Sequence, residues 1–207
     1  MRIILIRHGE TYANTLFGTD EQILIGALDA PISQLNEVGK QQAIQAGDKI
    51  KHLTVDEIYS SDLGRTIETT SLVFPNRTFE TTHLLRERSL GSDEGLKASE
   101  VFAREDAMKH YVDSDNDSVE DCMNKRVDDG ESYQMVCDRL REFLSQFDYT
   151  EDKTVACIAH FHTIRCMTYV LLDKEPDTDI AKLMIPNATP IFFEYKDGKF
   201  NQVESFE

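Results

Sequence analysis

Short apolar runs alternate with amphipathic segments along most of this chain. The runs at residues 3–6, 55–59 and 154–158 are short and contain β-branched side chains, which is typical of strands buried in a sheet. Segments between and after them repeat apolar residues at helical spacing. Because strands and helices alternate, the pattern predicts an α/β fold, a three-layer sandwich with helices on both faces of a mostly parallel central sheet.

The helices can be placed from their caps and apolar stripes. Asn36 is a good N-cap, so a first helix is expected to begin near it. A second helix is expected to begin at Ser60 or Ser61 and to carry Arg65 in its first turns. A third is expected over roughly residues 131–147, with an apolar stripe that we assign to the core: Tyr133, Val136, Leu140, Phe143 and Phe147.

Toward the end of the chain, another helix is expected after His162. Two strands near residues 191–193 and 200–203 are expected to form a hairpin across Asp197-Gly198. Residues 97–129 differ from the rest because they are strongly acidic and have no strand signal. We interpret them as a partly helical insertion within a single domain that spans residues 1–207. A solvated surface segment is the alternative, and it stays open.

Composition and charge narrow the class of protein. A chain of 207 residues, 40% of them hydrophobic and 29% charged, is ordinary for one soluble domain with a sizeable core. The formal net charge of −16 argues against nucleic acid and anionic membranes as partners. There is no apolar run long enough for a bilayer and no secretory signal, so we expect a cytoplasmic protein. The oligomeric state stays open.

Charged and imidazole side chains follow the predicted strands at the points where each strand ends. Arg7 and His8 follow the first, Arg65 comes shortly after the second, and His160 follows the third. In open α/β folds ligands bind outside the carboxyl ends of the strands, so we expect these four side chains to meet there. Forked guanidinium donors, imidazoles and nearby helix N-termini are what phosphate recognition requires.

The chain resembles the histidine phosphatase superfamily, which has the phosphoglycerate mutase-like fold. The matching motifs occur in the family's order over most of the chain: RHGET at 7–11 with Asn14, DAPIS at 29–33, GKQQA at 39–43, SSDLGRT at 60–66, Glu87, GES at 130–132 and Ala-His at 159–160. Each motif alone is only moderately specific, but the ordered set is a strong signal.

The resemblance implies a role for each of these residues. His8 would be the nucleophile that forms a phosphohistidine, with its other ring nitrogen held by a hydrogen bond, often to a backbone carbonyl. Arg7 and Arg65 would clamp the non-bridging oxygens of the phosphate. His160 would donate a further hydrogen bond to the transferred group, and Asn14 would contact the phosphate.

Glu87 is the candidate proton donor to the leaving group. For that role we expect its pKa to be raised by burial and by the nearby phosphate. The flanking Arg86 and Arg88 would lower it if they pointed inward, so both are expected to face away. Glu94, in the turn that follows, is the rival candidate.

Two features depart from the family's pattern. Phe161 stands where members commonly have a glycine, and the loop from Asn14 to Gly26 looks a few residues longer than usual. Both put the fit of the substrate in question, not the phosphate site. In the resembled family an insertion such as residues 97–129 caps the active site. Mutases commonly carry a pair of arginines there, and this stretch has only isolated basic residues and Lys125-Arg126 among its acids.

We therefore expect a phosphatase that acts on a small phosphorylated metabolite, without metal or other cofactor. The alternatives are a phosphoglycerate mutase and a phospho-ligand binding module without turnover. A metal pair at His160 and His162 would require the strand to continue through them, and no second pair of ligands has suitable spacing. His52, His83 and His110 are expected at the surface. The cysteines, which show no CxxC spacing, are expected to be reduced: Cys122, Cys137, Cys157 and Cys166.

Overall fold

A computed structural model describes residues 1–113, 115–174 and 178–206, and within them the chain forms one mixed sheet of six strands. The strand order is β3-β2-β4-β1-β5-β6. The strands are β1 (Arg2–Arg7), β2 (Glu57–Ser61), β3 (Glu80–Thr82), β4 (Thr154–Ala159), β5 (Pro190–Lys196) and β6 (Lys199–Val203). The first four pair in parallel, whereas β5 and β6 are antiparallel. The predicted α/β fold with a mostly parallel sheet is confirmed.

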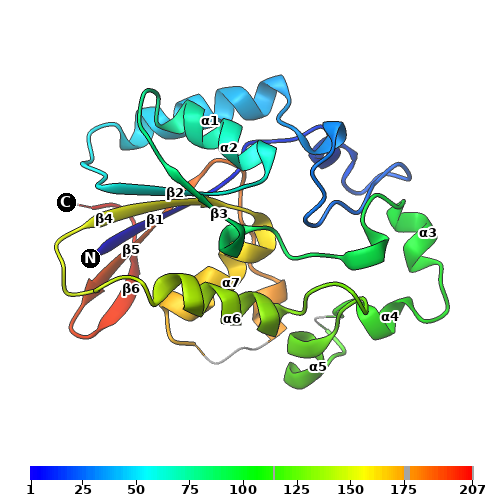
Figure 1. Cartoon of the computed structure of the whole chain (residues 1–207). Helices are drawn as coiled ribbons and strands as arrows, with labels where there is room; N and C mark the ends of the chain where they lie inside the picture. Colours follow the sequence, from blue (N-terminus) through cyan, green and yellow to red (C-terminus); the bar gives the residue numbers. More distant parts are fainter. Residues whose placement is uncertain (114, 175–177, 207) are drawn as a thin grey trace.

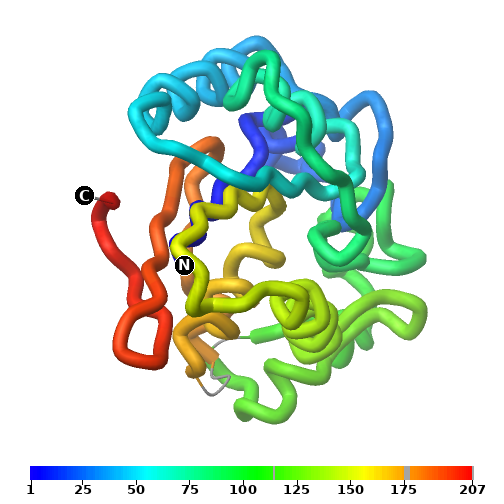
Figure 2. The backbone as a smooth tube through the Cα atoms, turned by 60° about the vertical axis from the view of Figure 1, so that its left-hand side comes forward, coloured from blue at the N-terminus to red at the C-terminus, as the bar shows by residue number. Residues whose placement is uncertain are grey.

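Helices cover both faces of this sheet. In Figure 1, α1 (Glu37–Ile50) and α2 (Gly64–Val73) lie above it, and α6 (Tyr133–Leu144) and α7 (Phe161–Leu171) lie below it; the tube in Figure 2 shows the same layers from another side. Side chains of β1 alternate between the two layers, as a strand requires. Ile3 and Leu5 belong to the core between the sheet and helices α6 and α7, and Ile4 and Ile6 belong to the core between the sheet and helices α1 and α2.

The helix boundaries follow from local capping, and two expectations about them were wrong. Asn36 caps α1 as predicted, because its side chain accepts a hydrogen bond from the Gly39 amide at 2.8 Å. α2 begins at Gly64, not at Ser60 or Ser61, since both serines are fully buried and extend β2. α7 begins directly after β4 at Phe161, so the segment from His160 to His162 turns into a helix and does not continue as a strand.

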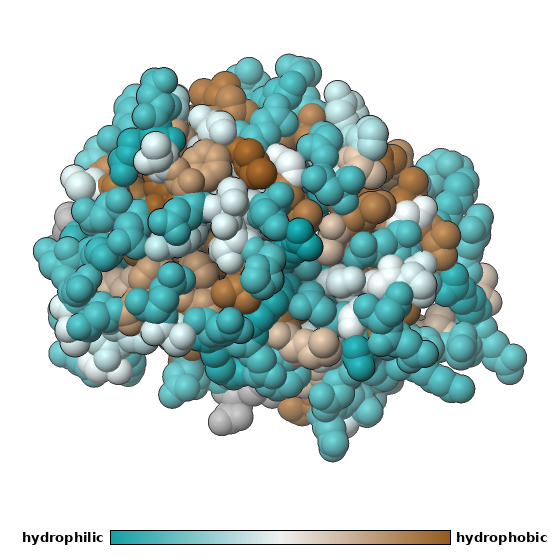
Figure 3. All heavy atoms as spheres, viewed as in Figure 1, coloured by the Kyte–Doolittle hydropathy of each residue, from teal (hydrophilic) through white to brown (hydrophobic). Residues whose placement is uncertain are grey.

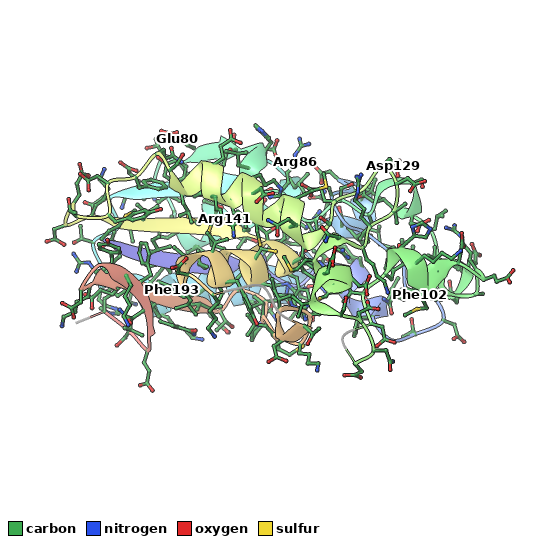
Figure 4. All side chains as sticks on the ribbon, turned by 90° about the horizontal axis from the view of Figure 1, so that it is seen from below. Glu80, Arg86, Phe102, Asp129, Arg141 and Phe193 are labelled. Carbon is green, nitrogen blue, oxygen red and sulfur yellow. The ribbon has the colours of Figure 1, made fainter. Side chains whose placement is uncertain are left out.

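The acidic insertion is partly helical, as expected. It contains α3 (Ala98–Phe102), α4 (Ala107–His110) and α5 (Val119–Asn124), while residue 114 lies outside the described residues. These helices lie beyond the ends of the parallel strands, at the right in Figure 1. Figure 4 places Phe102 and Asp129 at that same end, far from Phe193 in β5. A small separate core joins the insertion to the loop after β1. Leu24 of that loop packs there with Leu90, Ala98, Val101 and Tyr111.

The remaining elements are short. The 3₁₀ turns are η1 (Ala13–Leu16), η2 (Pro31–Ser33), η3 (His83–Leu85), η4 (Gly91–Asp93) and η5 (Thr178–Ala181). The predicted hairpin is confirmed, with longer strands than expected. At its turn Asp197 and Gly198 have φ values of 55° and 82°, the left-handed conformation that tight hairpin turns need. Hydrophilic side chains predominate on the face in Figure 3, and no helix among the described residues is long and apolar enough to cross a membrane.

The sheet topology creates one place where a ligand can enter between chain segments. β1 and β4 are parallel neighbours, yet the chain leaves β1 toward the α1 face and leaves β4 into α7 on the opposite face. Where the connections of adjacent parallel strands diverge, a crevice opens at the carboxyl ends of those strands. His8 and His160 are the first residues after β1 and β4, so both stand at this point.

Candidate active site

The two histidines that follow β1 and β4 lie side by side. Their ring centroids are 5.3 Å apart, and His8 and His160 are only 5% and 0% exposed. The sheet pairing continues up to them, because the His8 amide donates to the Ala159 carbonyl at 3.0 Å. Ladder hydrogen bonds and burial therefore fix both rings at the divergence of the two strands.

The hydrogen bond of His8 determines which of its ring nitrogens carries the proton. Nδ1 lies 2.7 Å from the carbonyl oxygen of Gly9, and a carbonyl can only accept, so Nδ1 must be the protonated nitrogen. Burial lowers the pKa of His8 well below its usual value, and Arg65 and Arg7 lower it further, so the ring is neutral. The result is an imidazole whose Nε2 lone pair accepts no hydrogen bond from the part of the chain that the structure describes.

His160 is held in the opposite state. Nε of Arg65 donates to Nδ1 of His160 at 3.2 Å, so Nδ1 must be the acceptor. Burial and then Arg65 lower the pKa of His160 well below its usual value, and a neutral ring with an acceptor at Nδ1 carries its proton on Nε2. That Nε2–H is buried and has no hydrogen-bond partner among the described residues. It is a donor in place beside the Nε2 lone pair of His8.

Two guanidinium groups come with the histidines, as predicted. Arg65 is 2% exposed, and besides His160 it donates to the carbonyls of Leu28 at 3.0 Å and Gly26 at 2.9 Å. Arg65 thereby joins α2 to the loop after β1. Arg7 donates to the Ile185 carbonyl at 2.8 Å, its Nε is buried without a partner, and burial lowers its pKa to about 10. Both groups keep unused N–H donors.

Gly9 is required by the approach of a helix. A Cβ at this position would lie 2.3 Å from the backbone oxygen of Gly39 in the first turn of α1, and a Cβ at Gly39 would lie 2.0 Å from the Glu10 carbonyl. No side chain fits at either position. The backbone that approaches Gly9 is therefore that of α1, and this close contact holds the loop carrying His8 against the helix.

Glu87 reaches the same site, but its pKa differs from the expectation. Its carboxylate accepts hydrogen bonds from the amides of Arg88 at 2.9 Å, His162 at 3.1 Å and Thr163 at 3.2 Å. Burial alone would raise the pKa of this carboxyl, but His162 and these donors outweigh it and hold the pKa well below its usual value. Because the last two amides begin α7, Glu87 also stabilises the N-terminus of that helix.

The expectation for the arginines beside Glu87 is half correct. Arg86 is exposed and faces away, and both its Nε and its Nη2 donate to Asp62, at 2.7 and 2.8 Å. Arg88 is 6% exposed and points inward, with its guanidinium 4.9 Å from the ring centre of Tyr133. Glu94 is occupied structurally, because its Oε1 accepts from the amides of Ala27 and Leu90.

Phe161 lies against two arginines. The guanidinium of Arg165 is 4.0 Å from the centre of its ring, and that of Arg7 is 4.8 Å from it. Arg165 also donates to the Leu183 carbonyl at 2.6 Å and to the Tyr133 hydroxyl at 3.2 Å. Arg165 was not predicted from the sequence. Its position, four residues after Phe161 on the same helix, puts it on the same face and could have identified it.

Asn14 lies beside His8 and is oriented by Asn187, which was not predicted from the sequence. Its Oδ1 accepts from the Thr11 amide at 3.1 Å and from Nδ2 of Asn187 at 3.3 Å, which leaves the NH₂ group of Asn14 available. Asn187 also donates to the His8 carbonyl at 2.9 Å. Asn187 comes from the loop before β5, and no local pattern in the sequence connects that loop to His8.

The other candidates lie apart from this cluster. His52 and His83 are exposed, and His110 is partly exposed in the insertion. The four cysteines are buried and make no disulfide. The described residues contain no group of three or more histidine, cysteine, aspartate or glutamate side chains suited to hold a metal ion.

Known proteins resemble this chain over nearly its full length. A Salmonella choleraesuis protein described as the probable phosphoglycerate mutase GpmB is 27% identical over 205 residues, covering 97% of this chain and 87% of that protein. YhfR of Bacillus stearothermophilus is 25% identical with a TM-score of 0.79, over 97% of this chain and 94% of that one. Phosphoserine phosphatase of Entamoeba histolytica, solved with 3-phosphoglyceric acid, is 25% identical with a TM-score of 0.73, over 98% and 95%.

The match to a protein family is as extensive. The family description that fits is the histidine phosphatase superfamily, branch 1, and the match runs over residues 3–206. The match takes in every strand and helix described above, apart from Arg2 at the start of β1. This protein therefore belongs to branch 1 of the histidine phosphatase superfamily.

Proposed function

We propose that this protein is a metal-independent phosphomonoester hydrolase that acts on a small phosphorylated metabolite through a phosphohistidine on His8. The observation that carries the proposal is the pair of neighbouring imidazoles in complementary states. His8 offers a lone pair at Nε2 and His160 offers an N–H at Nε2. Attack on a phosphoryl group needs such a nucleophile beside a donor to the phosphoryl oxygens.

In the first step Nε2 of His8 attacks phosphorus in line, and the bond to the leaving oxygen breaks. His160 and the unused donors of Arg7 and Arg65 stabilise the non-bridging oxygens, with Asn14 as a further contact. The leaving oxygen takes a proton from Glu87. In the second step a water molecule, losing a proton to Glu87, attacks the phosphohistidine and releases inorganic phosphate.

The ionised state of Glu87 determines where the first proton comes from. The three backbone donors keep the carboxylate deprotonated in the free protein. A phosphomonoester loses its last proton with a pKa of about 6, so the substrate monoanion can bring the proton into the site. We propose that Glu87 receives this proton when the substrate binds and passes it to the leaving oxygen.

The test is to trap the phosphoenzyme. Protein mixed with a ³²P-labelled phosphomonoester in EDTA and quenched should carry acid-labile, base-stable label, and His8→Ala should carry none. His83→Ala removes an exposed imidazole and is the matched control. Label on His8→Ala, or turnover of an aryl phosphate by that variant within about tenfold of wild type, would refute the nucleophile. Loss of activity in EDTA would refute the metal-independent mechanism.

A phosphoglycerate mutase is the second candidate, and the similarity to GpmB favours it. After priming with 2,3-bisphosphoglycerate, a mutase would interconvert 3- and 2-phosphoglycerate faster than it releases phosphate. The hydrolase that we propose would release phosphate faster than it isomerises. Binding of phosphate esters without either reaction, across a broad panel, would instead indicate a binding module.

A further inference from the structure

Cations and aromatic rings alternate from the phosphate site toward Glu87. Arg7 and Arg165 both contact the ring of Phe161, and Arg165 donates to the hydroxyl of Tyr133. The guanidinium of Arg88 then lies 4.9 Å from the centre of the Tyr133 ring. His162 stands beside this row, with its ring centroid 5.8 Å from that of Tyr133. The row continues the positively charged surface of the phosphate site away from His8.

Arg88 and Arg165 are buried without an anion beside them. Each is 6% exposed, and neither makes an ion pair with any residue that the structure describes. Nε of Arg88 is buried and has no hydrogen-bond partner in that part of the chain. Burying an uncompensated charge costs several kcal/mol, so a protein that keeps two such groups together gains from an anion that binds to them.

The nearby carboxylates Asp93 and Glu131 already have ion-pair partners. Asp93 pairs with Arg104 and accepts from the Tyr111 hydroxyl, and Glu131 pairs with Arg139. None of them contacts Arg88 or Arg165. No carboxylate among the residues that the structure describes supplies the anion, so a bound ligand is the candidate.

A count of charges indicates how much negative charge is missing. A phosphomonoester dianion carries about two negative charges, which Arg7 and Arg65 can match. Glu87 balances one further positive charge in the free protein, but it becomes neutral once it has taken the proton of the substrate. Arg88 and Arg165 then both lack a counter-charge. A carboxylate, which guanidinium groups bind through forked hydrogen bonds, supplies one negative charge to this pair.

We propose that Arg88 and Arg165 form a second anion site next to the phosphate site, and that the preferred substrate is a compact phosphomonoester bearing a carboxylate. This inference rests on the proposed hydrolysis and names its substrate class. Only the ring of Phe161 separates Arg165 from Arg7. The carboxylate and the phosphate therefore belong to one short molecule.

The test compares two substrates of the same three-carbon skeleton, 3-phosphoglycerate and sn-glycerol 3-phosphate, which carry a carboxylate and a hydroxymethyl group respectively. Wild type should hydrolyse the acid with a kcat/KM at least about 10-fold higher, since one charge-assisted hydrogen bond is worth about that factor or more. Arg88→Gln should lower kcat/KM for the acid by about 10- to 100-fold, mainly through KM, and for the alcohol by less than about 3-fold. Arg88→Lys should recover part of the loss, because it restores the charge.

Arg86→Gln is the matched control, because that arginine flanks Glu87 on the other side, points outward and pairs with Asp62. It should leave the ratio of the two substrates unchanged. Equal kcat/KM values in wild type, or an equal loss for both substrates in Arg88→Gln, would overturn the inference. The wild-type ratio needs no variant to fold. If neither these two substrates nor an aryl phosphate is hydrolysed, the proposed function itself is refuted. If the aryl phosphate is hydrolysed but 3-phosphoglycerate is not preferred over sn-glycerol 3-phosphate, only the second anion site is refuted.

Discussion

The substitution Arg65→Lys removes the hydrogen bonds of one buried guanidinium group but keeps its positive charge. Arg65 donates from three nitrogens in three directions, to Nδ1 of His160 and to the carbonyls of Leu28 and Gly26. A lysine ammonium is a single point at the end of a flexible chain and cannot reach all three acceptors. The positive charge remains, while the tautomer of His160 and the position of the 26–28 loop lose their support.

The size of the effect follows from these contacts. Loss of one donor that acts on the transition state costs about 2.7–4 kcal/mol, so kcat should fall by about 10²- to 10³-fold. Two partly buried carbonyls, those of Gly26 and Leu28, also lose a partner, at up to about 1–3 kcal/mol each when they stay unsatisfied. Because the lysine can satisfy one of them, we expect the free energy of unfolding to fall by about 1–3 kcal/mol.

Three measurements together decide the outcome: kcat with an alkyl phosphate, urea unfolding, and ¹⁵N NMR of the histidine rings. Wild type should show His160 with its proton on Nε2, and Arg65→Lys should show a mixture of tautomers. Arg77→Lys is the control, since the Arg77 side chain donates to the Val55 carbonyl, away from the site. If Arg65→Lys kept kcat within about 3-fold and left the tautomer of His160 unchanged, the reasoning about His160 would be wrong.

Three further outcomes are expected. For an alkyl phosphate, kcat/KM should fall about tenfold per pH unit above about pH 6, because Glu87 is ionised and the substrate brings the proton. Because His8 is already neutral, the pH–rate profile should have no acidic limb near pH 6.5, and a limb there would contradict this assignment. The pKa values of His8, His160 and His162 are lowered in the folded protein, so near pH 6.5 the unfolded chain binds more protons than the folded one. The free energy of unfolding should therefore fall as the pH drops from 7.5 to 5.5, by up to about 1.4 kcal/mol per pH unit per ring. Urea titrations should give a smaller pH slope for His160→Gln than for wild type, and an equal slope would contradict the assignment. Asn187→Asp replaces a donor to two oxygens by a carboxylate and should lower unfolding free energy by about 1–3 kcal/mol and raise KM, whereas Asn201→Asp on β6 should do neither.

The strands and the residues that follow them were predictable because both signals are local. Apolar runs located β1 and β4, and the polar residues just after them, His8 and His160, had to lie at the rim of a parallel sheet. Arg65 was predictable for the same reason. The start of α2 was misjudged because Ser60 and Ser61 resemble N-caps, whereas burial and pairing with β3 keep them in the strand.

The electrostatic state of the site was not predictable, because it depends on contacts between distant segments. The pKa of Glu87 is lowered by amides of α7, and nothing near Glu87 in sequence indicates that this helix starts beside it. Arg88 turns inward onto Tyr133 of α6, while Arg86, two residues earlier, finds Asp62 at the surface. Alternation along an irregular loop could not decide between these two directions.

The low pKa of Glu87 bears on which half of the proposed reaction is slower. A carboxyl that the N-terminus of α7 and His162 hold in its ionised form is a strong acid once the substrate has protonated it, so it gives its proton readily to a leaving oxygen. The same stabilisation makes it a weak base toward the water that must attack the phosphohistidine. Formation of the phosphoenzyme is therefore favoured over its breakdown, and a rapid quench during turnover is expected to find His8 phosphorylated in a large share of the molecules.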